Sequence, residues 1–587
     1  MQQDPLLDVE HLTVGFRNDS GETVAVDDIS FNIGKSEILG IVGESGSGKS
    51  VTALSILGLI PDPPGVVTAE AIRLADSSGQ MIRLETLTER ELQRIRGQSV
   101  SMIFQEPMTS LNPVFTCGNQ VSETLRRHLG ISKKAARERV LELFNEVSLP
   151  ESSRIYRSYP HELSGGQKQR VMIAMAISCK PSLLIADEPT TALDVSVQKT
   201  ILDLLKELQQ KMKMSILFIT HDLGLISRFA DRVLVMYQGK IVEDGEVTRV
   251  FDHPQHPYTQ GLIACRPPLD VRLRRLPTVE DYISSPQLAV GFERHRASGI
   301  RHPEEIVTRE QRELDHQKLY SREAVLRVNH VGKKFSKGTD WLSREKESTR
   351  AVDDVSFLVY PGETLGIVGE SGCGKTTLSR VILKLIPASE GEILYKDTDI
   401  TTLTHSKLKA LHKDLQIVFQ DPYSSLNPRM AIGEAIREPM EVHHLYGNKR
   451  QRIVKVYDLL QKVGLNPEYY NRYPHEFSGG QRQRICIARA LAVEPRLIIC
   501  DESVSALDIS IQAQILNLLN DLKRELHLTY IFISHDLNVV KYMADRLIVM
   551  KEGRIVEMGD PDEIYINPKS EYTKVLLEAL ENSEIVK

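Results

Sequence analysis

The sequence is duplicated: a long stretch of its first half returns, in the same order, in its second half. Residues 43–50 (GESGSGKS) return as 369–376 (GESGCGKT), and residues 159–167 (YPHELSGGQ) return as 473–481 (YPHEFSGGQ). Solenoid repeats have periods of only ~50 residues or fewer. The chain must therefore fold as two copies of one domain rather than as a stack of small repeats.

Length and composition agree with two globular domains. A chain of 587 residues exceeds what one hydrophobic core usually serves. Charged residues make up 26% of the chain, and its net charge is −6. This charge gives no case for a nucleic-acid partner, which needs a basic face, although a sum does not reveal a local basic patch. No two of the six cysteines lie at C-x-x-C spacing, so we expect reduced thiols and neither a zinc ribbon nor a disulfide framework.

Neither a signal peptide nor a membrane span is expected. Residues 1–5 lack a basic region followed by an apolar run. No segment approaches the ~20 consecutive apolar residues that a spanning helix needs. If the protein works at a membrane, other proteins must supply the spanning part.

The repeats divide the chain into two domains, residues 6–265 and 323–587, joined by a linker, residues 266–322. Apolar runs such as 39–42 and 183–186 alternate with helical stretches, which predicts an α/β fold with a mostly parallel sheet. The linker mixes both charge signs with several prolines, which favours a solvated segment with a short helix near 304–318. A docked regulatory segment stays open as the alternative.

Each copy carries a phosphate-binding loop of the form G-x-x-x-x-G-K-[ST] after an apolar strand. Its glycines let backbone N–H groups surround phosphates at a helix N-terminus. We expect Lys49 and Lys375 to reach the β- and γ-phosphates, and Ser50 and Thr376 to bind Mg²⁺. The residues expected to bind nucleotide in the two loops are Gly43, Ser45, Gly46, Gly48, Lys49, Ser50 and Val51, and Gly369, Ser371, Gly372, Gly374, Lys375, Thr376 and Thr377.

Carboxylates, amides and imidazoles follow further apolar runs. A carboxylate at a strand end can hold a metal ion, and an adjacent one can accept a proton from an attacking water. The expected metal ligands, besides Ser50 and Thr376, are Asp187, Asp501, Gln105 and Gln420. The expected catalytic residues are Glu188 and Glu502, with His221 and His535 placed to touch the γ-phosphate.

A Ser-Gly-Gly turn precedes a helical stretch in each copy. Such a turn offers a second anion-binding helix N-terminus per domain, one more than a single nucleotide requires. The economical explanation is that the two domains share their sites. The residues concerned are Ser164, Gly165, Gly166, Gln167, Ser478, Gly479, Gly480 and Gln481.

Together with Ala-Leu-Asp segments at 192–194 and 506–508, these motifs resemble those of ABC-type ATPases. The resemblance covers both copies. It implies two P-loop NTPase domains, each a mostly parallel sheet core with helices, an antiparallel β subdomain and a helical subdomain. It further implies head-to-tail composite ATP sites, in which each phosphate loop meets the other copy's Ser-Gly-Gly turn. Phe16 and Phe335 occupy the place of the aromatic that stacks on adenine.

The resemblance narrows to the ATPases of dipeptide, oligopeptide and nickel importers. Residues 105–113 and 420–428 carry their Ser-Leu-Asn-Pro segments, residues 256–259 read HPYT, and residues 571–573 read EYT. The resemblance implies a peptide-importing translocase that hydrolyses ATP with Mg²⁺, two transmembrane permeases, and an extracytoplasmic solute-binding protein as an indirect partner. The chain would lie peripherally on the cytoplasmic face of the inner membrane.

Cysteines distinguish this chain from many of those relatives. Only Cys265 lies where they carry a cluster of cysteines, so no iron–sulfur cluster is expected. Cys373 lies in the second phosphate loop near a helix N-terminus, a position that can depress a thiol pKa.

Other functions are less favoured. Soluble tandem ABC proteins acting on ribosomes usually have Asn-His-Leu-Asp where this chain has residues 191–194, TALD. A sugar importer is disfavoured by the Ser-Leu-Asn-Pro and HPYT segments. A nickel importer and an exporter stay open, because specificity and direction lie in other subunits.

Overall fold

The computed structural model describes residues 5–18, 21–76, 78–105, 110–190, 195–269, 271–284, 306–336, 348–505 and 507–581. These residues form two compact units. The first contains the described residues up to 263 and residues 282–284, and the second contains 264–281 and the residues from 306 onward. Within the described part, no helix is long and apolar enough to cross a membrane.

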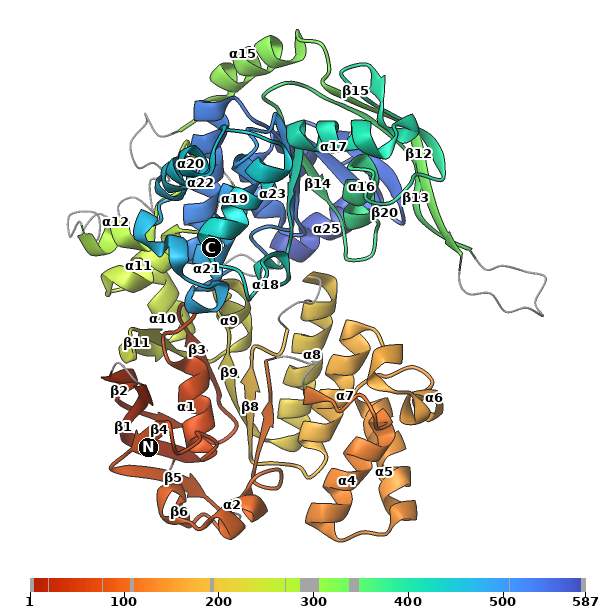
Figure 1. The fold of residues 1–587 in the computed structure, drawn as a ribbon. Coiled ribbons are helices and arrows are strands. Elements are labelled where there is room, and N and C mark those ends of the chain that lie inside the picture. Colours follow the sequence, from red (N-terminus) through yellow and green to blue (C-terminus); the bar gives the residue numbers. More distant parts are fainter. Residues whose placement is uncertain are drawn as a thin grey trace. The chain divides into compact units, whose positions relative to one another are not determined.

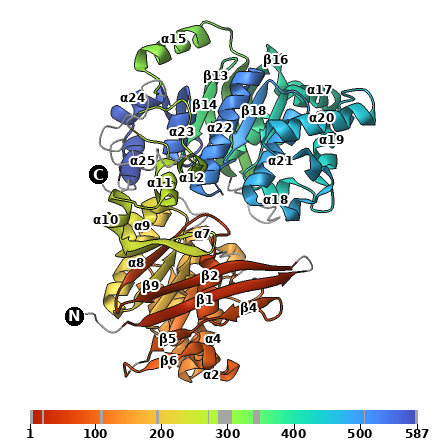
Figure 2. The ribbon, with the colours of Figure 1, turned by 90° about the vertical axis from the view of Figure 1, so that its left-hand side faces the viewer.

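The first unit contains an antiparallel sheet of order β2-β1-β5-β6, with β4 paired to β1. Figure 2 shows β1 and β2 as its long strands. Inward-facing residues of this sheet, such as Leu12 and Val26, are fully buried. The strands are β1 (Leu7–Asn18), β2 (Gly21–Ile33), β4 (Gly65–Thr68), β5 (Ala71–Ala75) and β6 (Met81–Arg83).

The second sheet of this unit has the order β11-β10-β3-β9-β8-β7, with only β11 antiparallel. Every residue of β3, β8 and β9 is buried, as expected for strands of a parallel sheet covered on both faces. The strands are β3 (Ile38–Val42), β7 (Val100–Ile103), β8 (Leu183–Asp187), β9 (Ser215–Ile219), β10 (Arg232–Tyr237) and β11 (Lys240–Glu246).

Helices accompany the parallel sheet, and α4 to α7 gather into a helical subdomain at one side (Figure 1). The helices of this unit are α1 (Lys49–Ile56), α2 (Glu89–Ile95), α4 (Cys117–Leu129), α5 (Lys133–Glu146), α6 (Ser152–Arg157), α7 (Gly165–Ile177), α8 (Val195–Met212), α9 (Leu223–Phe229) and α10 (Val247–Asp252). Two further helices, α11 (Pro257–Ala264) and α12 (Val279–Ser284), lie where the chain passes between the units.

The second unit repeats both sheets, with orders β13-β12-β15-β16 and β17-β18-β19-β14-β20-β21. Its strands are β12 (Leu326–Ser336), β13 (Ser348–Val359), β14 (Thr364–Val368), β15 (Glu390–Tyr395), β16 (Thr398–Asp399), β17 (Leu415–Val418), β18 (Leu497–Asp501), β19 (Thr529–Ile533), β20 (Arg546–Lys551) and β21 (Arg554–Gly559). Its helices are α15 (Arg309–Tyr320), α16 (Lys375–Ile382), α17 (His405–Asp414), α18 (Pro422–Ser425), α19 (Ile432–Val442), α20 (Lys449–Lys462), α21 (Gly479–Leu491), α22 (Ile509–Leu526), α23 (Leu537–Met543), α24 (Pro561–Ile566) and α25 (Glu571–Glu581). The α/β fold class is thereby confirmed in both copies.

The segment between the copies differs from a purely solvated linker. Helix α15 covers most of the range in which the sequence predicts a short helix, and it docks on the second unit. Arg312 of α15 is 8% exposed and pairs with Asp560, which precedes α24, and with Asp562 of α24. Leu276 is buried as well. The domain boundaries at 265 and 323 stay predictions.

Candidate functional site

The phosphate loop of the first unit connects β3 to α1. Gly48, the residue before α1, has φ 102°, and a Cβ there would lie 2.6 Å from the carbonyl oxygen of Ala25. Only glycine fits this left-handed, closely packed position. No side-chain hydrogen bond caps the helix, and a helix N-terminus of this kind favours a bound anion. Gly374 has the same conformation in the second unit, with φ 106°.

The loop lysines curl back over their own loops. Lys49 Nζ donates to the carbonyl oxygens of Gly43 at 2.8 Å and Glu44 at 2.7 Å. Lys375 makes the two equivalent bonds at 2.7 and 2.9 Å. Each ammonium group is therefore held at its own phosphate loop, from where it can reach the terminal phosphates.

A hydroxyl and a carboxylate meet beside each loop. Ser50 Oγ donates to Asp187 Oδ1 at 3.1 Å, and Thr376 Oγ1 donates to Asp501 Oδ1 at 3.3 Å. In the second unit Ser379 Oγ adds a bond to Asp501 Oδ2 at 3.0 Å. These are the hard oxygen ligands that Mg²⁺ prefers, so the residues fit such an ion.

Burial alters the acidity of the two aspartates. It raises the pKa of the Asp187 carboxyl to about 6, assisted by the charge of Glu188 and opposed by Ser50 and Lys49. Burial also raises the pKa of Asp501. A bound cation would favour the charged form of both carboxylates and so lower these pKa values.

The first candidate base, Glu188, is held from three strand ends. Its backbone has φ 47°, a strained conformation for a residue other than glycine, and its N–H donates to the Ile219 carbonyl at 2.9 Å. Gln105 Nε2 donates to Glu188 Oε2 at 3.1 Å, and His221 Nδ1 is hydrogen-bonded to Oε1 at 3.0 Å. The structure thus brings together the glutamine, glutamate and histidine that the sequence singled out.

The second candidate base, Glu502, has φ 49° and similar partners. Gln420 Nε2 donates to it at 2.9 Å, while His535 Nδ1 lies 3.4 Å and Lys375 Nζ 3.8 Å from its oxygens. Burial alone would raise the pKa of Glu502, but the hydrogen bond and charge of His535, with Lys375, lower it. Burial by itself would lower the pKa of His535, but the hydrogen bond and charge of Glu502 outweigh burial and raise it.

The Ser-Gly-Gly turns begin helices α7 and α21, as expected. Ser164 Oγ accepts from the N–H of Gln167, and Gln167 Oε1 accepts from the N–H of Ser164 at 3.1 Å. Ser478 and Gln481 repeat this reciprocal capping. The two glutamines thus shape the helix N-terminus, and their direct binding to nucleotide stays a prediction.

The remaining expected residues are less constrained. Phe16 lies on β1 against the core, and Phe335 lies on β12, 45% exposed, with Lys333 Nζ 5.1 Å above its ring. Their adenine-stacking role stays a prediction. The first Ala-Leu-Asp segment, residues 192–194, lies outside the described residues, as do residues 106–109.

One pair of contacts was missed by sequence reasoning. The Tyr258 hydroxyl accepts the N–H of Glu44 in the first phosphate loop at 2.9 Å, and the Tyr572 hydroxyl accepts that of Glu370 at 3.1 Å. Tyr258 is fully buried and stacks on Tyr237. The repeated Tyr-Thr pair near the end of each copy was the available signal, although it served only as a family marker.

One expectation is wrong. The position of Cys373 near a helix N-terminus suggested a depressed thiol pKa, but burial raises it, outweighing the charge of Lys375. The buried thiol is therefore not activated.

The model of the ABC transporter family matches residues 26–191 and 352–505. The model of the C-terminal region of oligopeptide/dipeptide transporters matches residues 242–288, which include Tyr258.

Similar proteins include the glutathione import ATP-binding proteins GsiA of Shigella dysenteriae serotype 1 and of Escherichia coli strain K12. Each is 46% identical over 584 residues, covering 99% of this chain and 90% of the relative. Among solved structures, the ADP- and Pi-bound dimeric ATP-binding cassette MJ0796 is 28% identical, with a TM-score of 0.37 over 40% of this chain and 98% of its own. CbiO1 of Clostridium perfringens is 27% identical, with a TM-score of 0.37 over 42% of this chain and 92% of its own.

Proposed function

The chain belongs to the ABC transporter family, and we propose that it is the ATPase that powers import of short peptides through two separate permeases. The observation that carries the proposal is the match of residues 242–288 to the oligopeptide/dipeptide transporter region. That match, within a chain that aligns with import ATPases over 99% of its length, favours this function over an ATPase acting on ribosomes.

The geometry of the first unit supports ATP hydrolysis. The N–H groups of the loop and Lys49 hold the phosphates, and Ser50 and Asp187 would hold Mg²⁺, which neutralises phosphate charge. Glu188 accepts the proton of the attacking water, while Gln105 and His221 fix its carboxylate. The second unit repeats every one of these groups, so both sites turn over.

We carry over from the family that each ATP is shared between the copies. Site one then uses the first phosphate loop with Ser478, Gly479 and Gly480, and site two uses the second loop with Ser164, Gly165 and Gly166. Replacing Ser478 with Arg tests this, because it should abolish trapping of ATP at site one in a Glu188→Gln protein. Normal trapping at site one would show that the copies work independently.

The solute is proposed as a short peptide. Relatives are named for glutathione, which makes that tripeptide the first solute to assay here. An extracytoplasmic binding protein would deliver it, and the chain would lie on the cytoplasmic face of the inner membrane, held there by the permeases.

The proposal is tested by affinity purification in mild detergent from native cells, using a Glu188→Gln/Glu502→Gln bait loaded with ATP and Mg²⁺. We expect two polytopic membrane proteins with the bait. A Lys49→Ala/Lys375→Ala bait, which cannot hold the phosphates, is the matched control and should retain less of them. Recovery of ribosomes without a permease would overturn the proposal.

A further inference from the structure

The second unit contains a cavity that none of the ATPase residues line. The segment around Arg272, helix α15, and the C-terminal ends of α22 and α23 enclose it. Its volume is about 800 Å³. That size is within the range of small-molecule sites.

Most of the charged side chains that line the cavity are positive. Six cationic side chains face only two carboxylates, Asp315 and Asp545, and the neutral lining includes His316 and His527. The cationic residues are Arg272, Arg274, Arg312, Arg322, Lys523 and Arg524.

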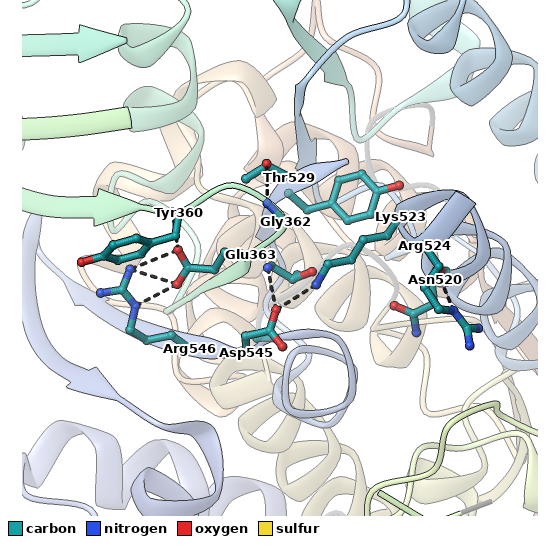
Figure 3. Close-up of polar contacts among 12 residues, drawn as sticks. Tyr360, Gly362, Glu363, Asn520, Lys523, Arg524, Thr529, Asp545 and Arg546 are labelled. Atoms are coloured by element: carbon teal, nitrogen blue, oxygen red, sulfur yellow. Dashed lines mark hydrogen bonds and ion pairs between the residues drawn. The ribbon is translucent and has the colours of Figure 1, made fainter. Parts of the chain in front are cut away.

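The carboxylates in and near the wall are already engaged (Figure 3). Asp545 Oδ2 accepts from Lys523 Nζ at 2.8 Å and from the N–H of Thr364 at 2.8 Å. To the left of Asp545 in this view, the buried Glu363 accepts from Arg546 at 2.9 Å. Of the arginines in the intervening segment, Arg312 pairs with Asp560 and Asp562. Arg272, by contrast, bonds only backbone carbonyl oxygens among the described residues.

Two of those arginines retain unmet donors. Arg272 Nη2 donates to the carbonyl oxygens of Tyr542 and Ala544, while its buried Nη1 has no partner among the described residues. Arg312, 8% exposed, likewise leaves Nε unmet within that part of the chain. Burial lowers the pKa of both groups, and the charge of Arg272 further lowers that of Arg312.

The helix dipoles do not account for this charge. Basic residues near the last turn of α22, such as Lys523 and Arg524, favourably face the negative end of the helix. The other four arginines come from residues 272–322, outside α22 and α23, and converge on the same cavity. Collecting like charges costs free energy unless an anion joins them.

We propose that this cavity binds a small anion bearing phosphate groups. Planar guanidinium groups bind phosphate oxygens in pairs. Arg274 and Arg322 line the cavity and are exposed, so a ligand that enters from solvent can reach both. The bound anion ties the segment between the two copies to the ends of α22 and α23.

The test is calorimetric titration of the full-length protein with pyrophosphate, after both phosphate loops have been filled with Mg²⁺ and a non-hydrolysable ATP analogue. We expect saturable binding that an Arg274→Ser/Arg322→Ser variant weakens by at least about tenfold. Both side chains are exposed, so the variant should fold. The matched control, Arg94→Ser/Arg309→Ser, removes equal charge at exposed sites outside the cavity and should bind as the unmodified protein does.

A second arm identifies the source of the phosphate. Flotation with phosphatidylglycerol vesicles that depends on Arg274 and Arg322 would assign a lipid headgroup, whereas pyrophosphate binding without flotation would assign a soluble phosphate ester. Equal pyrophosphate affinity in all three proteins, or neither binding nor flotation in the unmodified protein, would overturn the proposal.

Discussion

At the scale of single residues, both phosphate loops depend on a tyrosine far away in the sequence. Tyr258 and Tyr572 each accept a backbone N–H from the second residue of a loop. A loop that must present several N–H groups to phosphates needs its remaining groups fixed. The buried phenol of Tyr258, stacked on Tyr237, is a rigid support of that kind.

Tyr258→Phe removes that hydrogen bond and keeps the ring. Because one hydrogen bond contributes ~0.5–1.5 kcal/mol, we expect the KM for ATP to rise about two- to tenfold with little change in melting temperature. Steady-state ATPase assays measure this. Tyr457→Phe, which removes a hydroxyl from a 40% exposed ring on α20, is the control. An unchanged KM in Tyr258→Phe would show that the contact is incidental.

At the scale of elements, the chain between the two copies is anchored to the second unit through α22. The Leu276 N–H donates to Asn517 Oδ1 at 2.9 Å, and Asn517 Nδ2 donates back to the Leu276 carbonyl at 2.8 Å. Asn517 is 3% exposed and Leu276 1%. A buried side-chain amide that pairs with both the N–H and the carbonyl of one residue fixes the position of the segment, because any shift would leave buried polar groups without hydrogen bonds.

Leu276→Asp should release this segment. A carboxylate cannot be buried there without a partner, so the segment leaves its site instead. We expect amide hydrogen exchange in residues 271–281 to speed up at least about tenfold, while β14 and β19 exchange as before. Leu314→Asp on α15, where the side chain is already 52% exposed, serves as the control. Unaltered exchange in 271–281 would contradict the docking.

At the scale of the whole molecule, the two copies repeat the same catalytic groups but differ in the residues around them. Both units hold the glutamate, glutamine and histidine in one cluster at the ends of parallel strands. Only the second adds a serine hydroxyl to its aspartate, because Ser379 stands where the first copy has Ala53. The docked segment and its basic cavity belong to the second unit.

Most of the fold and of the ATPase site could be predicted from the sequence. Continuous apolar runs ending in glycine or acidic residues predict buried parallel strands whose carboxyl ends meet at one edge. Asp187, Glu188 and His221 therefore came together as expected, since strand order alone places them there. The prediction of a depressed thiol pKa for Cys373 was wrong. It used the nearby helix N-terminus, which can be recognised from neighbouring residues, whereas the burial that raises the pKa comes from residues far away in the sequence.

The sequence by itself determined two ATPase domains, because phosphate chemistry demands particular residues at short, fixed spacing. Only the tertiary structure decided which residues support the phosphate loops and where the segment between the two copies packs. Tyr258 reaches Glu44, and Arg272 reaches Tyr542, across hundreds of residues. The charged composition of residues 266–322 favoured a solvated segment, because composition does not show which partners a charged side chain meets in the fold. In the folded chain, Arg312 is buried against Asp560 and Asp562. Other arginines of the same segment line one cavity with it.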